Sequence, residues 1–231
     1  VVISLFVNPT QFGPGEDLED YPRDFKRDKT LAEKTGVDII FYPSDKEMYP
    51  DRFLTRVTVD KITEVLCGVS RLHHFQGVTT VCAKLFNIVK PHLAVFGQKD
   101  FQQSVVIKQM VRDLNIDMDI ITGPIIREAD GLAMSSRNTY LSEDERRDAI
   151  SLNQSLFQAK EMVQQGERET KVLSQFIEDK ISSRKSARID YISIVHPRTL
   201  EPLEVIRVNA LIALAVFVGK TRLIDNVLIE I

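Results

Sequence analysis

The sequence predicts an α/β protein with a doubly wound, Rossmann-like parallel sheet followed by a smaller α+β domain. Continuous apolar runs such as residues 1–7 and 93–96 are typical of strands buried in a parallel sheet. Amphipathic helical segments alternate with these runs, as in repeated strand–helix units. Beyond residue 126, two helices precede strands that look antiparallel. We therefore expect one domain at 1–125 and a second at 126–231.

The composition excludes several classes of protein. The chain has 231 residues, of which 43% are hydrophobic and 27% charged, as in a globular protein with a substantial core. A net charge of -3 offers no general basic field for nucleic acid. No apolar run approaches the ~20 residues of a membrane span. The two cysteines, Cys67 and Cys82, make no disulfide framework, so we expect a reduced, cytoplasmic compartment.

The first strand, residues 1–7, leads into a loop with polar side chains. Asn8 and Gln11 follow its carboxyl end, which is where open α/β sheets bind ligands. Gln11 is either a ligand contact or an exposed loop amide. The charged residues 16–28 favour a solvated loop over a metal site. The next expected elements are a helix at 24–34, a strand at 37–42, an alternating strand at 53–59, and a short helix at 61–66 capped by Asp60.

A core-facing amphipathic helix is predicted at 78–89 from its apolar spacing. Arg71, His73 and His74 lie just before it. Adjacent histidines point apart on a helix and make a poor metal pair. One of them either contacts an anionic substrate or anchors the loop by hydrogen bonding.

The predicted strand at 93–96 ends at Gly97, and a cluster of polar residues follows. A glycine there lets a ligand approach the backbone, and Lys99 is a mobile charge suited to phosphate. Asp100 either faces a ligand or caps the helix expected at 105–114. The other polar residues of this loop are Gln98, Gln102, Gln103 and Ser104.

A second candidate anion loop follows the strand expected at 117–122. Met134, Ser135, Ser136 and Arg137 place two hydroxyls beside a guanidinium, which is a weak signal for a phosphate clamp. The remaining expected elements are a capping box from Ser142 to Glu145, helices at 143–165 and 170–184, and strands at 189–195, 206–218 and 222–231.

Six motifs in chain order resemble the bacterial pantoate–β-alanine ligase family over the whole chain. They are Asn8-Pro9-Thr10-Gln11-Phe12, His74-Phe75 with Gly77-Val78, Lys84-Leu85-Phe86-Asn87-Ile88-Val89, Phe96-Gly97-Gln98-Lys99-Asp100 with Gln102-Gln103, Asp130-Gly131-Leu132-Ala133-Met134-Ser135-Ser136-Arg137-Asn138, and Arg222-Leu223-Ile224-Asp225-Asn226.

The resemblance implies a two-step reaction in a nucleotide- and pantoate-binding domain closed by a C-terminal lid. ATP and (R)-pantoate, with Mg²⁺, form pantoyl adenylate and pyrophosphate, and β-alanine then attacks to give pantothenate and AMP. Gln11 and Gln103 bind pantoate, and Gln11 also lies near β-alanine. The implied ATP contacts are Gly97, Gln98, Lys99, Asp100, Ile126 and Met134, with Ser135, Ser136 and Arg137 on phosphate oxygens. Lys99, Ser135, Ser136 and Arg137 are the implied catalytic groups, and no protein-only metal site is implied.

The resemblance also implies a homodimer, joined through the N-terminal domain. The family's first strand and its Met-Gly-x-Leu-His-x-Gly-His motif have no match in these residues, so we expect them upstream of Val1. Leu72-His73 replaces the family's usual Pro-Gly, and Cys67 lies where some members carry a carboxylate. Two alternatives remain: an inactive binding or dimerisation module, and another nucleotidyltransferase of the superfamily.

Overall fold

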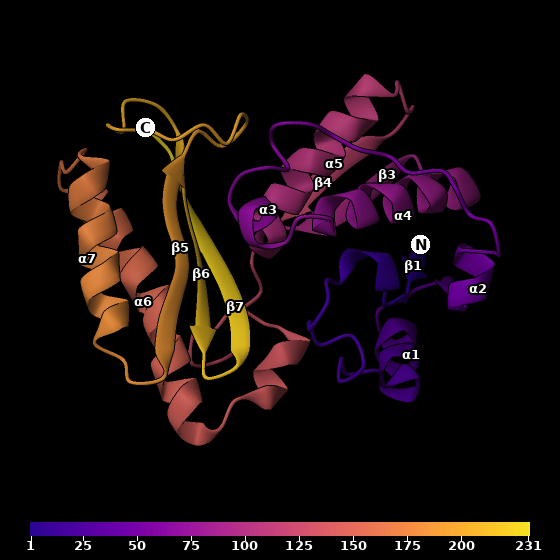
Figure 1. Ribbon diagram of the computed structural model, residues 1–231, viewed down its shortest axis with the longest axis horizontal. Coiled ribbons are helices and arrows are strands. Elements are labelled where there is room, and N and C mark those ends of the chain that lie inside the picture. Colours follow the sequence, from indigo (N-terminus) through magenta and orange to yellow (C-terminus); the bar gives the residue numbers. More distant parts are fainter.

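The computed structural model describes residues 1–231, which form two bodies lying side by side (Figure 1). The first body holds strands β1 to β4 and helices α1 to α5, and the second holds α6, α7 and strands β5 to β7. This is a Rossmann-like α/β unit followed by a smaller α+β unit, as the sequence predicts. None of the helices combines the length and the apolar character needed to cross a membrane.

The first body contains two parallel strand pairs. β1 (Val2–Ser4) pairs with β2 (Ile39–Phe41), and β3 (Leu93–Gly97) pairs with β4 (Asp119–Gly123). α1 (Phe25–Lys34) follows β1, and α5 (Phe101–Asp113) connects β3 to β4. The parallel pairing is confirmed, but the two pairs share no hydrogen bond and do not make one continuous sheet.

Burial of these strands on both faces, predicted from their apolar runs, is wrong for parts of them. Val95 in β3 is 66% exposed and Ile39 in β2 is 57% exposed. Ala94 and Phe96 of β3 pack on the core formed with α4 and α5, whereas the alternate side chains, including Val95, lie on the opposite face in solvent.

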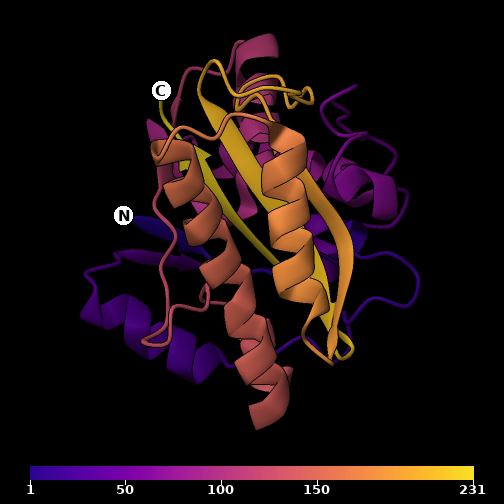
Figure 2. The same cartoon turned by 90° about the vertical axis from the view of Figure 1, so that its left-hand side faces the viewer.

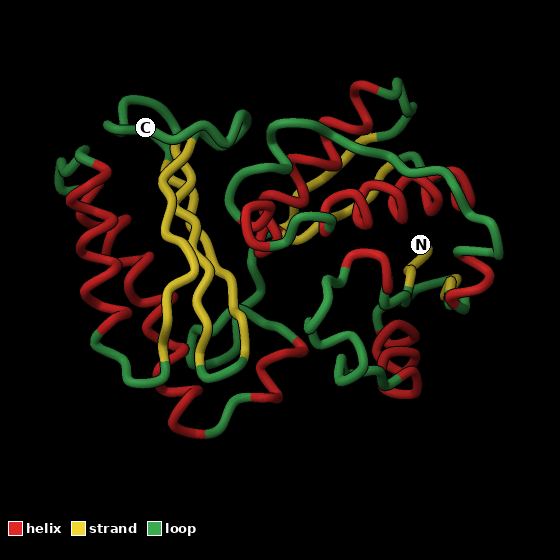
Figure 3. Tube along the Cα trace, viewed as in Figure 1, coloured by secondary structure: helices red, strands yellow, loops and turns green.

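Two predicted elements between α2 (Asp45–Met48) and α3 (Cys67–Ser70) are also wrong, because Figure 3 shows this stretch as loop. Residues 53–59 pair with no strand. Instead Val57 N–H donates to Thr80 Oγ1 at 3.0 Å, and Thr79 Oγ1 donates to the Val57 carbonyl at 2.6 Å. Side chains of α4 (His74–Val89) therefore take the place of a strand partner. No helix forms at 61–66, where the first and last residues, Lys61 and Leu66, have positive φ angles of 64° and 51° that a helix does not allow.

The core of the first body confirms the apolar spacing of α4. Val78, Val81, Cys82 and Phe86 of α4 pack against α5 and Met48. The helix begins at His74, four residues before the predicted start, so its first turn reaches the loop after β1. The first turn of α4 therefore packs against the turn at residues 9–11 that carries Gln11.

The second body is an antiparallel sheet covered on one face by two helices, as Figure 2 shows. The strands are β5 (Ala187–Val195), β6 (Ala210–Val218) and β7 (Thr221–Ile229), in that spatial order. α6 (Glu143–Gln164) and α7 (Thr170–Ser182) pack on it through an apolar core. β6 begins four residues later than predicted. The central strand is the most buried, since it has a neighbour on each side.

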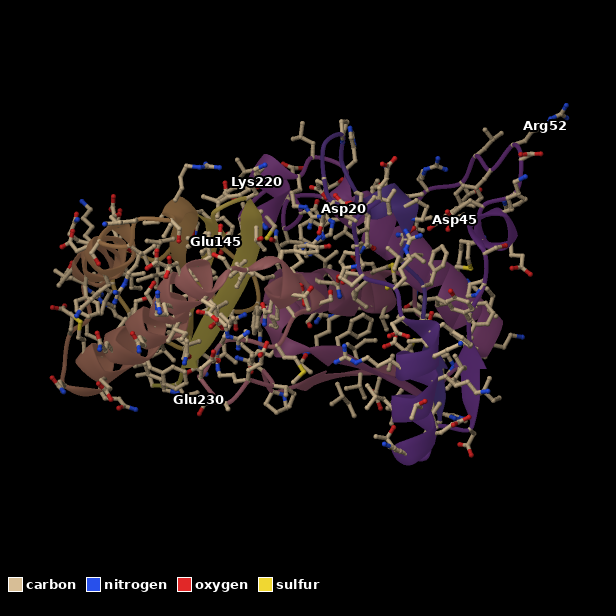
Figure 4. All side chains as sticks on the ribbon, turned by 90° about the horizontal axis from the view of Figure 1, so that it is seen from below. Asp20, Asp45, Arg52, Glu145, Lys220 and Glu230 are labelled. Atoms are coloured by element: carbon tan, nitrogen blue, oxygen red, sulfur yellow. The ribbon has the colours of Figure 1, made fainter.

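The start of α6 confirms the predicted capping box. Glu145 N–H donates to Ser142 Oγ, and Ser142 N–H donates back to Glu145 Oε2 at 2.9 Å. The turn between β6 and β7 lies against the same carboxylate, and Figure 4 shows Glu145 and Lys220 near each other. Gly219 in this turn has a φ of 58°, and a Cβ there would lie 1.8 Å from Glu145 Oε1, so any other residue would be strained and would displace the Glu145 side chain.

Candidate functional site

A cleft of about 520 Å³ brings together nearly all the predicted site residues. They come from the loop after β1, the turn after β3, and the loops after β4. The predicted residues that line it are Gln11, Gly97, Lys99, Asp100, Gln103, Ile126, Met134, Ser135, Ser136 and Arg137. Gln98 is the one predicted residue that does not line it.

Gln11 is held by Asn8, a residue without a role in the predicted site. Asn8 is buried, and its Nδ2 donates to Gln11 Oε1 at 3.2 Å and to the Gly77 carbonyl at 3.1 Å. Tyr49 OH donates to Asn8 Oδ1 at 2.7 Å. A Cβ on Gly77 would lie 2.5 Å from the Thr10 carbonyl oxygen, so the glycine allows this close approach. With its oxygen engaged, Gln11 keeps its NH₂ group for a ligand.

The turn after β3 presents a lysine and a carboxylate to the cleft. Lys99 Nζ lies 3.5 Å from Asp100 Oδ2, and nothing lies within 4 Å of a Cβ built on Gly97. Asp100 occupies the position before α5, but its side chain accepts no capping hydrogen bond and is 48% exposed. The capped-turn interpretation is therefore wrong for its side chain, which remains available to a ligand.

The neighbouring glutamines of α5 have different surroundings. Gln102 is only 6% exposed, accepts from Cys67 N–H at 3.0 Å, and donates to the Ile62 and Val65 carbonyls at 2.9 and 2.7 Å. All its amide groups are thus used within the protein. Gln103 lines the cleft, where its amide is available.

Gln98 faces the other body. Its Nε2 donates to Asn226 Oδ1 at 3.3 Å, and Asn226 Nδ2 donates to the carbonyls of Gln98 and Lys99, both at 3.0 Å. A ligand in the cleft can therefore meet the backbone near Gln98 but not its amide.

The second anion loop carries Arg137, which is already paired. Ser135 Oγ accepts from Arg137 N–H at 3.3 Å and so shapes the turn. The Arg137 guanidinium donates twice to Asp17, with both N···O distances at 2.7 Å, and lies 5.2 Å from the Tyr21 ring centroid. Burial raises the pKa of the Asp17 carboxyl, but hydrogen bonding and charge attraction from Arg137 outweigh it and leave that pKa lowered.

Arg71 and His74 are the functional candidates that the sequence left undecided. Arg71 donates to Glu16 through Nε at 2.7 Å and Nη2 at 2.6 Å. His74 Nδ1 lies 2.9 Å from the Gln11 carbonyl oxygen and Nε2 lies 3.2 Å from Arg71 Nη1, so Nδ1–H donates and Nε2 accepts. Burial, and next the charge of Arg71, lower the pKa of His74 to about 4, so the ring is neutral at pH 7.

The acidic loop is therefore more than the solvated loop predicted from its charge. Glu16 and Asp17 each hold an arginine at the cleft. No group of three or more His, Cys, Asp or Glu side chains comes together as a metal site. With Lys99, Arg71 and Arg137 around it, the cleft attracts anions, and the loop carboxylates occupy two of these cations.

Comparisons with known proteins identify the family. The family described as pantoate-beta-alanine ligase matches residues 1–228. Proteins named pantothenate synthetase from Acetivibrio thermocellus and Caldicellulosiruptor saccharolyticus are 58% and 59% identical over 230 residues, covering 100% of this chain and 82% of each relative.

Solved structures lead to the same family. Pantothenate synthetase from Thermus thermophilus is 45% identical with a TM-score of 0.95, covering 98% of this chain and 82% of that one. Pantoate-beta-alanine ligase from Francisella tularensis, complexed with beta-gamma ATP and beta-alanine, is 35% identical with a TM-score of 0.77, covering 98% and 78%. With its whole length matched at these identities, the chain belongs to the pantoate–β-alanine ligase family.

Proposed function

We propose that this protein joins (R)-pantoate to β-alanine with the consumption of ATP, giving pantothenate, AMP and pyrophosphate. A pantoate carboxylate oxygen attacks the α-phosphorus, and the bond from that phosphorus to the bridging oxygen of pyrophosphate breaks. The β-alanine amine then attacks the acyl carbon of pantoyl adenylate, and AMP leaves. One observation carries the proposal: amide, lysine, serine and arginine groups of the family's motifs converge on one cleft of about 520 Å³.

The nucleotide side of the proposed site is formed by the two anion loops. Lys99 and Arg137 neutralise charge on the phosphates, and the hydroxyls of Ser135 and Ser136 donate to phosphate oxygens. Gly97 leaves room for the nucleotide against the backbone. Gln98 acts through its backbone, because Asn226 holds its amide. Ile126 and Met134, both more than half exposed in the cleft, contact the adenine end.

The acyl side of the proposed site is formed by two amides. Gln11 and Gln103 both line the cleft and bind the hydroxyls and carboxylate of pantoate. Because Asn8 and His74 fix Gln11 from two sides, its free NH₂ is presented in one orientation. Catalysis then comes mainly from holding carboxylate and α-phosphorus together and from stabilising charge on the leaving pyrophosphate.

Mg²⁺ fits this donor set as a companion of ATP. Asp100 is a half-exposed carboxylate in the cleft, and Mg²⁺ in such sites takes one or two carboxylates together with substrate phosphates and water. The ion would supply charge neutralisation on the phosphates. Asp100 is the residue we assign to it.

Two assays test the proposed function. Pantoate-dependent exchange between ATP and labelled pyrophosphate reports adenylate formation, and β-alanine-dependent AMP release reports the second step. We expect both in the full-length enzyme. Absence of both would restore the alternative of an inactive module. Transfer of AMP to a phosphorylated acceptor, without any need for β-alanine, would identify another nucleotidyltransferase instead.

The cytoplasmic location and the homodimer stay predictions. Sedimentation at equilibrium measures the second: a mass of twice the chain supports it, and a single-chain mass contradicts it.

A further inference from the structure

Two neighbouring polar residues of β7 are buried without being part of the cleft's predicted chemistry. Asp225 and Asn226 are each 3% exposed. β7 is an outer strand of its sheet, and successive side chains of a strand point to opposite faces. Asp225 shares its face with Leu223 and Val227, which belong to the core under α6, so Asn226 points to the face that meets the first body.

The Asn226 side chain is hydrogen-bonded to the turn that carries Lys99. Its Nδ2 donates to the carbonyls of Gln98 and Lys99, both at 3.0 Å, and its Oδ1 accepts from the Gln98 amide at 3.3 Å. Both of the amide's donors and its acceptor are thus used on one three-residue turn. A buried side chain bonded in this way fixes the backbone from which Lys99 projects.

Asp225 forms an ion pair with Arg127, in the segment that leads to the second anion loop. Arg127 donates to its two oxygens at 2.7 and 2.9 Å and also to the Gly131 carbonyl at 3.1 Å. The backbone of Arg127 pairs with Ala133, and Met134 N–H donates to the Ile126 carbonyl at 2.9 Å. The guanidinium therefore ties a small hairpin to β7 immediately before the loop 134–137.

The two anion loops make no hydrogen bond to each other. Asn226 is bonded to the turn that carries Lys99, and Asp225 is bonded through Arg127 to the hairpin that precedes the loop 134–137. Asp225 Oδ1 also accepts from Asn226 N–H at 2.8 Å. We propose that Asp225 and Asn226 are positioning residues that set the distance between Lys99 and the loop 134–137, so that both reach the phosphates of one ATP. This inference rests on the proposed function.

The test begins with Asn226→Asp, which keeps the shape but turns a donor into an acceptor facing two carbonyls. In the full-length enzyme we expect kcat/KM for ATP in pantoate-dependent pyrophosphate exchange to fall about 10²-fold, since small misplacement of a reacting group costs that much. Val227→Ala is the matched control, because it weakens the same strand without touching either loop. We expect it to lower Tm and leave kcat/KM within about twofold.

A double-mutant cycle on ATP affinity distinguishes positioning from general destabilisation. Titration calorimetry gives the Kd for ATP without requiring turnover. Asn226→Asp should raise Kd about tenfold alone, and by less than about twofold in a Lys99→Ala background. Asp225→Asn should likewise lose its effect in an Arg137→Ala background, but keep it beside Lys99→Ala. This crossed pattern is not expected from a loss of stability.

Three results would overturn the inference. The first is exchange kinetics of Asn226→Asp equal to those of Val227→Ala. The second is an effect of each substitution on the Kd for ATP that is the same in the wild-type, Lys99→Ala and Arg137→Ala backgrounds, and the third is an Asn226→Asp chain that binds ATP normally. If Asn226→Asp does not fold, Asn226→Ser at the same position decides between these outcomes. A full-length wild-type enzyme that shows no pantoate-dependent exchange would instead overturn the proposed function.

Discussion

Asp17 and Arg137 form a two-point ion pair across 120 positions of sequence, with both N···O distances at 2.7 Å. The carboxylate offers the guanidinium the same planar, two-oxygen partner that a phosphate offers. The acidic loop after β1 therefore occupies the Nε–Nη2 edge of an arginine that we assign to ATP, and Asp17 competes with ATP for that edge.

Asp17→Asn should consequently favour ATP. The pair is about a quarter exposed on each side, so we expect KM for ATP to fall about two- to fivefold and the free energy of unfolding to fall by less than about 1 kcal/mol. Steady-state kinetics with saturating pantoate measure the first. Asp20→Asn, in the same loop but without an ion pair, is the control. A rise in KM with Asp17→Asn would show that the loop carboxylate assists binding.

Lys99→Ala should remove most of the rate of adenylate formation. The side chain is the cation of the turn after β3, and removing such a group costs about 10² to 10³ in rate. Pantoate-dependent pyrophosphate exchange measures it, with Lys29→Ala on the outer surface of α1 as the control. Near-normal exchange in the Lys99 variant would remove this residue from the phosphate site.

The lowered pKa of His74 predicts that the free energy of unfolding decreases in mild acid. Its folded pKa of about 4 lies below the ordinary value of 6.5, so the unfolded chain binds more protons between these values. The contribution of His74 is complete above about pH 6.5 and falls as pH drops toward 4, by on the order of 3 kcal/mol.

Urea unfolding at several pH values measures this slope. His74→Asn should flatten it between pH 6.5 and 4, whereas His73→Asn, at the exposed neighbouring position, should leave it unchanged. Equal slopes in wild type and His74→Asn would mean that the fold does not lower the pKa of His74.

Ser142→Ala should affect stability alone. It removes the hydroxyl half of the capping box at the start of α6 and is expected to cost about 1 kcal/mol. Ser174→Ala in the middle of α7 is the control, because alanine favours a helix interior. Thermal unfolding measures both variants. A change in KM for either substrate of the Ser142 variant would contradict a purely structural role.

The local sequence pattern was sufficient to predict most of the helices and strands. Apolar spacing predicted α4, and Ser142 with Glu145 predicted the start of α6. It failed at residues 53–59, where alternation indicated a strand but the backbone bonds to Thr79 and Thr80 side chains. Alternation reports which side chains are buried, and it does not report what the backbone pairs with.

The same limit applies to the candidate site. The motifs around Gln11, Lys99 and Arg137 predicted three loops that the fold brings to one cleft. They assigned Gln98 to ATP and Gln103 to pantoate, and nothing in the local pattern showed that the Gln98 amide would be bonded within the protein. Only the position of β7 turns the first toward Asn226 and leaves the second in the cleft.

The sequence by itself determined the α/β order of elements, the family, and the residue types from which the site is built. These depend on periodicity and on motifs a few residues long. The tertiary structure alone decided that Asp17 holds Arg137, and that Asp225 and Asn226 hold the two anion loops. Those contacts join positions about a hundred residues apart. The Asn226 contacts exist because the second body packs β7 against the first, and the Asp17–Arg137 pair exists because the loop after β1 meets the loop after β4. No local pattern encodes either arrangement.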